Sequence, residues 1–311
     1  MKHIFGVDIG GTSIKFGLFS EAGDLLENWN IATNRGEALL PDVARSIHEK
    51  IVEKSMSKTD IIGVGVGIPG PVTDEGVVVV GVNIGWPNPV SVKAQLEALL
   101  ALPVFLANDA NVAALAELWQ GIAIGCKNAV MYTLGTGVGG GIIVDGKVIH
   151  GTNGAGGEVG HLISVPNGYP CNCGSKGCLE TVTSATGIVR ETKAYLDSYD
   201  EVSMLRDLPE FEAKDIFEAA KHDDPVALKM VDQVGYHLGL AFASLTATTD
   251  PEKIIMGGGV SKAGDILINA VKKHYQQFAF SPLKDTPIVL AKLGNDAGII
   301  GAAYLALSQA S

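Results

Sequence analysis

Short runs of β-branched and other apolar residues alternate along the chain with longer segments whose apolar positions recur every three or four residues. The first pattern predicts strands and the second predicts amphipathic helices, so their alternation favours a layered α/β fold. Val43, Ile47 and Ile51 follow this helical spacing within Asp42–Lys54, and a long apolar helix is predicted over Pro225–Leu245. The predicted strands are His3–Ile9, Ile14–Phe19, Ile61–Ile68, Val104–Ala107, Ala129–Leu134, Gly141–Val144 and Lys253–Met256.

The composition suits one large domain or two ordinary ones. The chain has 311 residues, of which 47% are hydrophobic and 18% charged, so it can bury a large core. A boundary is expected near Trp119–Asn128, where Gly121 and Gly125 follow a helix predicted to begin at Asn108. The more charged stretch Tyr195–Asp215 is interpreted as a pair of solvated surface helices.

Charge and hydropathy exclude several classes of partner. A net charge of −11 disfavours binding to a nucleic-acid backbone, which depends on clustered Lys and Arg. No apolar run approaches the roughly 20 residues that a membrane-spanning helix needs. Met1 leads directly into a predicted strand, without the basic segment and cleavage site of a signal peptide. We therefore expect a cytoplasmic protein with no nucleic-acid and no membrane partner.

Glycine provides the first chemical signal. The chain has 39 glycines, well above the average of roughly 7%, and many are clustered. Asp8, Gly10, Gly11 and Thr12 belong to the segment DIGGT between two predicted strands. Such a hairpin can cradle a phosphate with its backbone N–H groups, and Lys15 adds a cation nearby. Taken alone, the same segment could be an ordinary glycine hairpin.

Two further glycine clusters strengthen a nucleotide-binding interpretation. Gly135, Thr136 and Gly137 lie in LGTGVGGG, again between two predicted strands, which suggests two loops facing each other across a cleft. The sequence has neither the GK[ST] ending of a Walker A loop nor a helix where a dinucleotide fingerprint requires one. Gly258 and Gly259 follow a third strand and precede a helix. They could line a nucleoside pocket, meet a phosphate, or only allow close packing of strand and helix.

DIGGTSIK, LGTGVGGG, GAGGEVGH with CNCGSKGCLE, and GGGVSKAG occur in an order and spacing that resemble the ROK family of repressors, open-reading-frame proteins and kinases. The resemblance covers essentially the whole chain and is strongest to bacterial ATP-dependent glucokinases. It implies an α/β fold of the actin-like ATPase or hexokinase (ribonuclease H-like) type, with two α/β domains around a cleft. The domains expected are residues 1–119 with a returning C-terminal helix at 297–311, and residues 120–296.

Three of the four cysteines form the motif CxCx4C at Cys171, Cys173 and Cys178. In a cytoplasmic protein, clustered thiols indicate a metal site more than a disulfide. A tetrahedral zinc site needs one more ligand, and His161 lies ten residues before Cys171, although three cysteines could also merely pack in a glycine-rich loop. The family resemblance implies that all four bind structural Zn²⁺ in the second domain. Such a closed site would organise its surroundings rather than transfer phosphate.

Asn108 and Asp109 end a predicted strand and begin a predicted helix, a usual place for active-site residues in α/β proteins. Both residues could also serve simply as a helix N-cap. The resemblance implies that Asp109 is the catalytic base that accepts the proton of the attacking sugar hydroxyl. It also implies that Asn108, Glu158, His161 and Glu180 bind the sugar.

The resemblance further implies ATP with catalytic Mg²⁺, and Asp8 is a candidate for contacting the metal through water. Val82–Trp86 is similar to the NLGW element of the family's glucokinases, which favours glucose, although Trp86 could only pack a loop. The expected reaction is the phosphorylation of glucose to glucose 6-phosphate, the first step of glycolysis. Kinases for N-acetylmannosamine, fructose or mannose remain alternatives, as does polyphosphate as the phosphate donor.

A regulatory function is the competing class, because some relatives are repressors. Those relatives carry a DNA-binding domain before the first glycine motif, whereas here the motif begins at Asp8. The acidic charge and the presence of Asp109 also disfavour a repressor, but a sugar sensor without turnover remains open. The resemblance also implies a homo-oligomer, either a dimer or a tetramer.

Overall fold

The computed structural model describes residues 2–310, which form two five-stranded sheets and a two-stranded one. The first sheet has the order β3-β2-β1-β4-β7 and the second β10-β9-β8-β11-β12. The first sheet consists of β1 (His3–Ile9), β2 (Ser13–Ser20), β3 (Leu25–Ala32), β4 (Ile61–Ile68) and β7 (Val104–Asn108). The two-stranded sheet consists of β5 (Val77–Val78) and β6 (Val90–Ser91). The second large sheet consists of β8 (Ala129–Leu134), β9 (Val138–Val144), β10 (Lys147–Val148), β11 (Lys253–Gly257) and β12 (Ile288–Leu290).

The two large sheets share one topology. In each, three strands form an antiparallel meander, and the first of these strands also pairs in parallel with a later strand, which pairs in parallel with another. The C-terminal ends of β1, β7, β8 and β11 all contribute residues to the same group of cavities. The C-terminal ends of these strands, from both large sheets, therefore lie close together, in the position where α/β proteins commonly bind ligands.

Helices cover both sheets and bury their outer faces. Leu39, Val43 and Ile47 of α1 join the apolar core of the first sheet, while Val234 and Leu238 of α7 join the core of the second. The helices are α1 (Leu39–Glu53), α2 (Val92–Leu100), α3 (Asp109–Trp119), α4 (Glu180–Thr183), α5 (Ala185–Ser198), α6 (Ala213–Lys221), α7 (Pro225–Thr249), α8 (Asp265–Phe278) and α9 (Ala297–Gln309).

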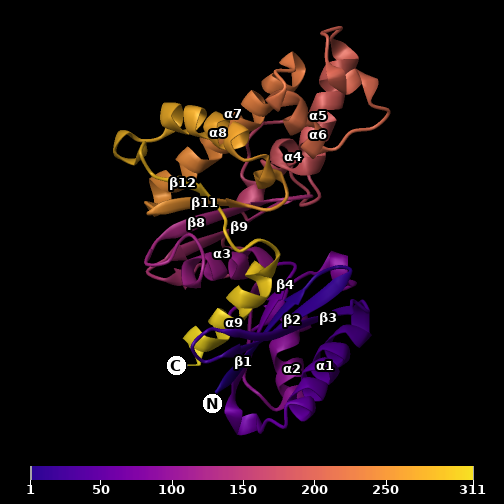
Figure 1. Cartoon of the computed structure of the whole chain (residues 1–311), viewed down its shortest axis with the longest axis vertical. Helices are drawn as coiled ribbons and strands as arrows, with labels where there is room; N and C mark the ends of the chain where they lie inside the picture. Colours follow the sequence, from indigo (N-terminus) through magenta and orange to yellow (C-terminus); the bar gives the residue numbers. More distant parts are fainter. Residues whose placement is uncertain (1, 311) are drawn as a thin grey trace.

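The last helix, α9, returns to the first sheet and packs against β1, β4 and α3 (Figure 1). A glycine allows this close approach: a Cβ atom at Gly65 of β4 would lie 1.7 Å from the carbonyl oxygen of Ala302. Helix α3 also contacts β8 and β9 of the second sheet, and Ala114 and Leu118 join a cluster with Met131. Helix α3 is therefore packed against both large sheets.

The charged stretch Tyr195–Asp215 differs from its prediction as a pair of helices. Helix α5 ends at Ser198, α6 begins at Ala213, and the segment between them contains only a short 3-10 turn over Met204–Asp207. Asp224, the N-cap of α7, contacts this segment: its carboxylate accepts hydrogen bonds from the Ser203 hydroxyl (3.0 Å) and the Met204 amide (2.7 Å). These contacts hold the segment against the start of α7.

Candidate active site

Three connected cavities lie where the carboxyl ends of the two sheets meet. A polar cavity of about 760 Å³ and a central cavity of about 500 Å³ share Asp109 and Gly258. An apolar cavity of about 780 Å³ shares Gly259 and Lys262 with the central one. The three cavities therefore form a continuous path, and the Asp109 carboxyl group lies at the junction of the first two.

The start of α3 positions Asn108 and Asp109. The Asn108 side chain accepts a hydrogen bond from the Ala110 amide (2.8 Å) and donates one to the Gly70 carbonyl (3.2 Å). One Asp109 carboxylate oxygen also accepts from the Ala110 amide (2.8 Å). Burial raises the pKa of Asp109 above its ordinary value, and the nearby hydrogen bonds only partly oppose this effect. Asn108 is thus a true N-cap. The Asp109 carboxyl group has protein atoms densely packed around it, which accounts for its desolvation, but it stays accessible to solvent and faces two cavities.

Two more carboxyl groups and a histidine line the polar cavity. Burial is the main reason that the pKa of Glu158 is raised, and the His161 ring opposes it from a distance of 3.8 Å between Nε2 and Oε2. Glu180, the first residue of α4, accepts a hydrogen bond from the Val138 amide (3.0 Å). The predicted set Asn108, Asp109, Glu158, His161 and Glu180 is therefore brought together around one cavity.

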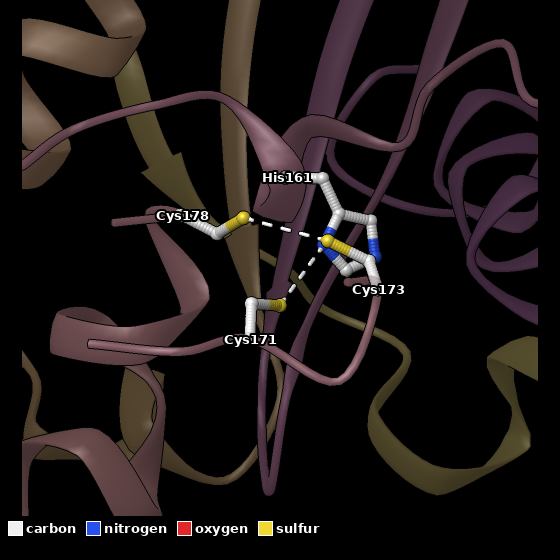
Figure 2. Close-up of side chains that lie close together, drawn as sticks. All are labelled: His161, Cys171, Cys173 and Cys178. Atoms are coloured by element: carbon white, nitrogen blue, oxygen red, sulfur yellow. Dashed lines mark hydrogen bonds between the residues drawn. The ribbon is translucent and has the colours of Figure 1, made fainter. Parts of the chain in front are cut away.

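The four predicted zinc ligands also lie together. Ligand atoms of His161, Cys171, Cys173 and Cys178 all lie within 4.8 Å of one another, and Figure 2 shows the His161 ring beside the three sulfur atoms. The Cys173 and Cys178 sulfurs are 3.6 Å apart, as are the Cys171 sulfur and His161 Nδ1. Tetrahedral Zn²⁺ with Zn–S bonds of about 2.3 Å requires sulfur atoms about 3.8 Å apart. The residues present therefore fit a closed Zn²⁺ site.

The cysteine cluster and the polar cavity share a wall. His161 directs Nδ1 to the Cys171 sulfur and Nε2 to Glu158. The Cys171 sulfur also lies 3.6 Å from a carboxylate oxygen of Glu180. A metal held by the cluster would therefore fix the orientation of side chains that line the cavity.

The central cavity contains Asp8, Lys15 and Lys262. The pKa of Asp8 is raised from 3.8 to about 6, mainly by burial and then by the charge of Asp109, while Lys15 lowers it. The Lys15 ammonium donates a hydrogen bond to the Asn295 carbonyl (2.9 Å), just before α9. Two lysines beside a carboxyl group at a glycine-lined cavity suit a phosphate chain with a bound cation.

Removing the charge of the half-buried Asp8 carboxylate is expected to stabilise the fold. Since the folded pKa of about 6 exceeds the ordinary 3.8, ionised Asp8 disfavours folding at every pH above about 6. This penalty declines as the pH falls from 6 to 3.8. We expect Asp8→Asn to raise the free energy of unfolding at about pH 8 by about 1 to 3 kcal/mol. Urea unfolding at about pH 8 and pH 4 checks this; equal effects at both values would contradict it.

The glycine motifs differ in how they meet the cavities. Gly135 lines the polar and apolar cavities, Thr136 the apolar one and Gly137 the polar one. By contrast, Gly10, Gly11 and Thr12 line none of these three cavities. The Gly10 carbonyl accepts from the Thr33 hydroxyl (2.7 Å), and the Gly11 carbonyl from the Arg35 guanidinium (3.1 Å). Phosphate binding by this first loop stays a prediction.

Several cavity residues were not foreseen from the sequence. Lys262 lies within the motif GGGVSKAG, where its charge next to three glycines was an available signal. Phe211, in the segment just before α6, and Phe217, within α6, line the apolar cavity. Asn83 and Asn172 also line the polar cavity. Both lie inside motifs singled out above, Val82–Trp86 and CNCGSKGCLE, but neither was named as a site residue.

Two sheets of one topology that meet at these cavities define the class of fold shared by actin-like ATPases and hexokinases. The chain belongs to the ROK family, whose sequence profile matches residues 4–309, so the resemblance inferred from the motifs is confirmed. It is 44% identical over 312 residues to a glucokinase from Halalkalibacterium halodurans, covering 98% of this chain and 94% of that protein.

Two solved structures resemble the whole chain. The ROK hexokinase from Thermus thermophilus has a TM-score of 0.83 and 31% identity, covering 99% of this chain and 98% of that one. A ROK family glucokinase from Streptomyces griseus, solved in complex with glucose and AMPPNP, has a TM-score of 0.78 and 33% identity, covering 97% and 98%. Among residues 2–310, no helix combines the length and the apolar character that crossing a bilayer requires.

Proposed function

We propose that the protein transfers the terminal phosphate of ATP to glucose and releases glucose 6-phosphate and ADP. The position of Asp109 carries this proposal, because its carboxyl group lines both the polar and the central cavity. A base at this junction can reach a hydroxyl group in one cavity that attacks a phosphate in the other. The similarity to a glucokinase and to a structure holding glucose and AMPPNP supports the same reaction.

Each cavity suits one part of the two substrates. The polar cavity offers carboxylate, amide and imidazole groups from Asn108, Glu158, His161 and Glu180, which suit the hydroxyl groups of a sugar. In the central cavity, which carboxyl groups also line, Lys15 and Lys262 offer ammonium groups to the phosphates. The aromatic and aliphatic lining of the apolar cavity suits the purine ring. This order along the path would direct the terminal phosphate of ATP toward Asp109.

In the proposed reaction, a sugar hydroxyl oxygen attacks the γ-phosphorus and its proton moves to the Asp109 carboxylate. The bond between the γ-phosphorus and the bridging oxygen breaks, and ADP leaves with the electron pair. Phosphoryl transfer passes through a loose transition state, so positioning and charge stabilisation provide most of the acceleration. Asn108 contributes to positioning because its side chain is anchored to both α3 and Gly70.

Two metal ions are part of the proposal. Mg²⁺ bound with ATP would neutralise phosphate charge, and Asp8, one of the carboxyl groups lining the central cavity, would contact it through water. Zn²⁺ would be held by His161, Cys171, Cys173 and Cys178, which fit a tetrahedral site. Because four protein ligands leave no open position, Zn²⁺ would support the sugar-binding side chains and take no part in the transfer.

Contact between loops of the first and the second large sheet would help to exclude water, which competes with glucose as acceptor. Ala155, in the glycine-rich loop after β10, lines the polar cavity. Gly154 of this loop adopts a φ of +70° and packs on the backbone of Val72, so that a Cβ atom there would lie 2.5 Å from the Val72 carbonyl carbon. The loop from the second sheet thus touches a loop of the first sheet beside the polar cavity.

A coupled ADP-release assay with Mg-ATP tests the substrate. We expect saturable turnover with the highest kcat/KM for glucose, compared with fructose, mannose and N-acetylmannosamine. A preference for another hexose would keep the reaction and overturn the sugar. Sugar binding measured by calorimetry without any turnover would contradict the proposed kinase activity and favour a sugar sensor. A separate assay with polyphosphate in place of ATP tests the phosphate donor.

The cytoplasmic location and the homo-oligomeric state stay predictions.

A further inference from the structure

Glu117, near the end of α3, is a fully buried carboxylate in the wall of the central cavity, and the reaction described above assigns it no role. Its exposed fraction is 0%, and it receives three backbone hydrogen bonds of 2.8 Å each. One oxygen accepts from the Ile122 amide, and the other accepts from the amides of both Lys292 and Leu293. Hydrogen bonds to an ionised acceptor are stronger than neutral ones, and buried ionised groups need such partners.

The three amides belong to the two places where the chain passes between the sheets. Residues 120–128 lead from α3 to β8 in the second sheet, and residues 291–296 lead from β12 back to α9 on the first. We describe residues 2–119 with 297–310 as the first half and 120–296 as the second, which we also propose as the two domains. The single carboxyl group of Glu117 is therefore hydrogen-bonded to both of these connecting segments, which we call the two chain crossings.

The same contact reaches into the second sheet. The Ile122 carbonyl accepts a hydrogen bond from the Lys253 ammonium of β11 (2.8 Å), while the Ile122 amide donates to Glu117. The peptide units around Ile122 thus link α3 to the second sheet. The Leu293 side chain packs in the cluster that contains Ile299 and Ile300 of α9. Glu117 therefore connects both halves through short, buried contacts.

We propose that Glu117 is a positioning residue that couples closure of the two halves to the placement of Asp109. Both residues belong to α3, eight positions apart, which corresponds to about 12 Å along a helix. Because Glu117 fixes the far end of α3 to both crossings, movement of one half relative to the other moves Asp109 in a defined way. The kinetic part of this inference rests on the proposed kinase function.

Glu117→Gln is the test variant because it keeps the shape of the side chain and removes one acceptor oxygen. Its amide group must face either the Ile122 amide or the amides of Lys292 and Leu293, so at least one crossing is released. Glu252→Gln is the matched control. Glu252 is an exposed carboxylate that accepts from the Lys127 and Asn128 amides (2.6 and 3.0 Å) on the same crossing but makes no contact with the other.

The kinetic experiment measures kcat and KM for glucose and ATP well below the melting temperature of each variant. We expect kcat/KM for glucose to fall by about tenfold or more in Glu117→Gln, because closure orders the catalytic groups. Glu252→Gln should stay within about twofold of the unaltered protein. If Glu117→Gln lowers only the melting temperature and leaves kcat/KM unchanged, Glu117 is merely structural and the inference is wrong.

A second readout does not depend on activity. Hydrogen exchange at residues 120–124 and 291–294 should accelerate in Glu117→Gln, and small-angle scattering should show a weaker contraction on addition of glucose with a non-hydrolysable ATP analogue. Unchanged exchange would overturn the inference even if the protein proves not to be a glucose kinase. Unchanged contraction would overturn it where the unaltered protein contracts with these ligands. If Glu117→Gln does not fold, Glu117→Asp, which keeps the charge but has a shorter reach, is measured against the same expectations.

Discussion

Replacing Asp109 with asparagine is expected to lower kcat for glucose phosphorylation by about 10²- to 10⁴-fold, the usual contribution of a general base. Asparagine keeps the size and the hydrogen bond to the Ala110 amide but cannot accept the proton of the attacking hydroxyl. Sugar affinity should change little, because Asn108, Glu158 and Glu180 remain in the polar cavity. The measurement is the steady-state rate of ADP release together with glucose affinity by calorimetry.

The pH profile sharpens this prediction. Burial raises the pKa of Asp109 above 3.8, and only the ionised carboxylate can act as base. The rate of the unaltered protein should therefore fall as the pH decreases through this raised pKa, and the Asp109-dependent part of that fall should vanish in the variant. Asp145→Asn, at an exposed turn outside the three cavities, serves as control. An Asp109→Asn protein within about threefold of full activity would exclude Asp109 as the base.

Removing one cysteine of the cluster is expected to cause loss of the bound metal and to weaken the affinity for sugar. Cys178 is fully buried, and serine in its place offers a poor zinc ligand. Glu158 precedes His161 by three residues and Glu180 follows Cys178 by two, so the metal would order both flanks of the polar cavity. We expect Cys178→Ser to lose bound zinc and to weaken glucose affinity by about 10- to 100-fold, a range typical of losing support around a metal site.

Metal content by mass spectrometry and glucose affinity by calorimetry measure the two effects together. Cys126→Ser is the matched control, since Cys126 lies outside the cluster and should keep both the zinc and the affinity. A Cys178→Ser protein that retains one zinc per chain would contradict the ligand assignment. A zinc-free protein with unchanged glucose affinity would contradict the proposed structural role of the metal.

Buried central strands were predictable because their sequences are nearly continuous apolar runs. β1, β4 and β8 have the bounds expected from the sequence, and all three pair with neighbours on both sides. β3 was missed: it is an edge strand in which residues of neither face are fully buried, and its sequence LLENWNIA carries polar residues at several positions. Its apolar pattern is therefore too weak to mark it.

The grouping of the candidate site residues was predictable where they are close in sequence. The cysteine motif and the Asn108-Asp109 pair carry their chemistry within a few positions, and the family resemblance related them to Glu158 and Glu180. Glu117 has no such local signal beyond a lone acid in an apolar helix, because its partners lie at Ile122 and beyond residue 290. Contacts formed only when distant segments fold together leave no pattern in a single sequence.

Trp86 illustrates how a motif can mark structure rather than ligand contact. The ring is 7% exposed, joins the core of the first half, and donates its indole N–H to the Gly36 carbonyl (3.1 Å). It therefore packs the loop, which was the alternative considered for this residue. Its neighbour Asn83 lines the polar cavity, so the packed tryptophan holds a segment that faces that cavity.

If Glu117 acts as proposed, the two chain crossings that meet at it would also limit how the molecule can move. Two bodies joined by one flexible link can swivel in any direction, whereas two links held side by side leave essentially one axis of rotation. Each opening and closing would then retrace the same arc, so Asp109 and the glycine loop at 135–137 return to the same mutual alignment at every turnover. The reproducible alignment of these groups would in this way follow from how the backbone is connected, before any substrate is bound.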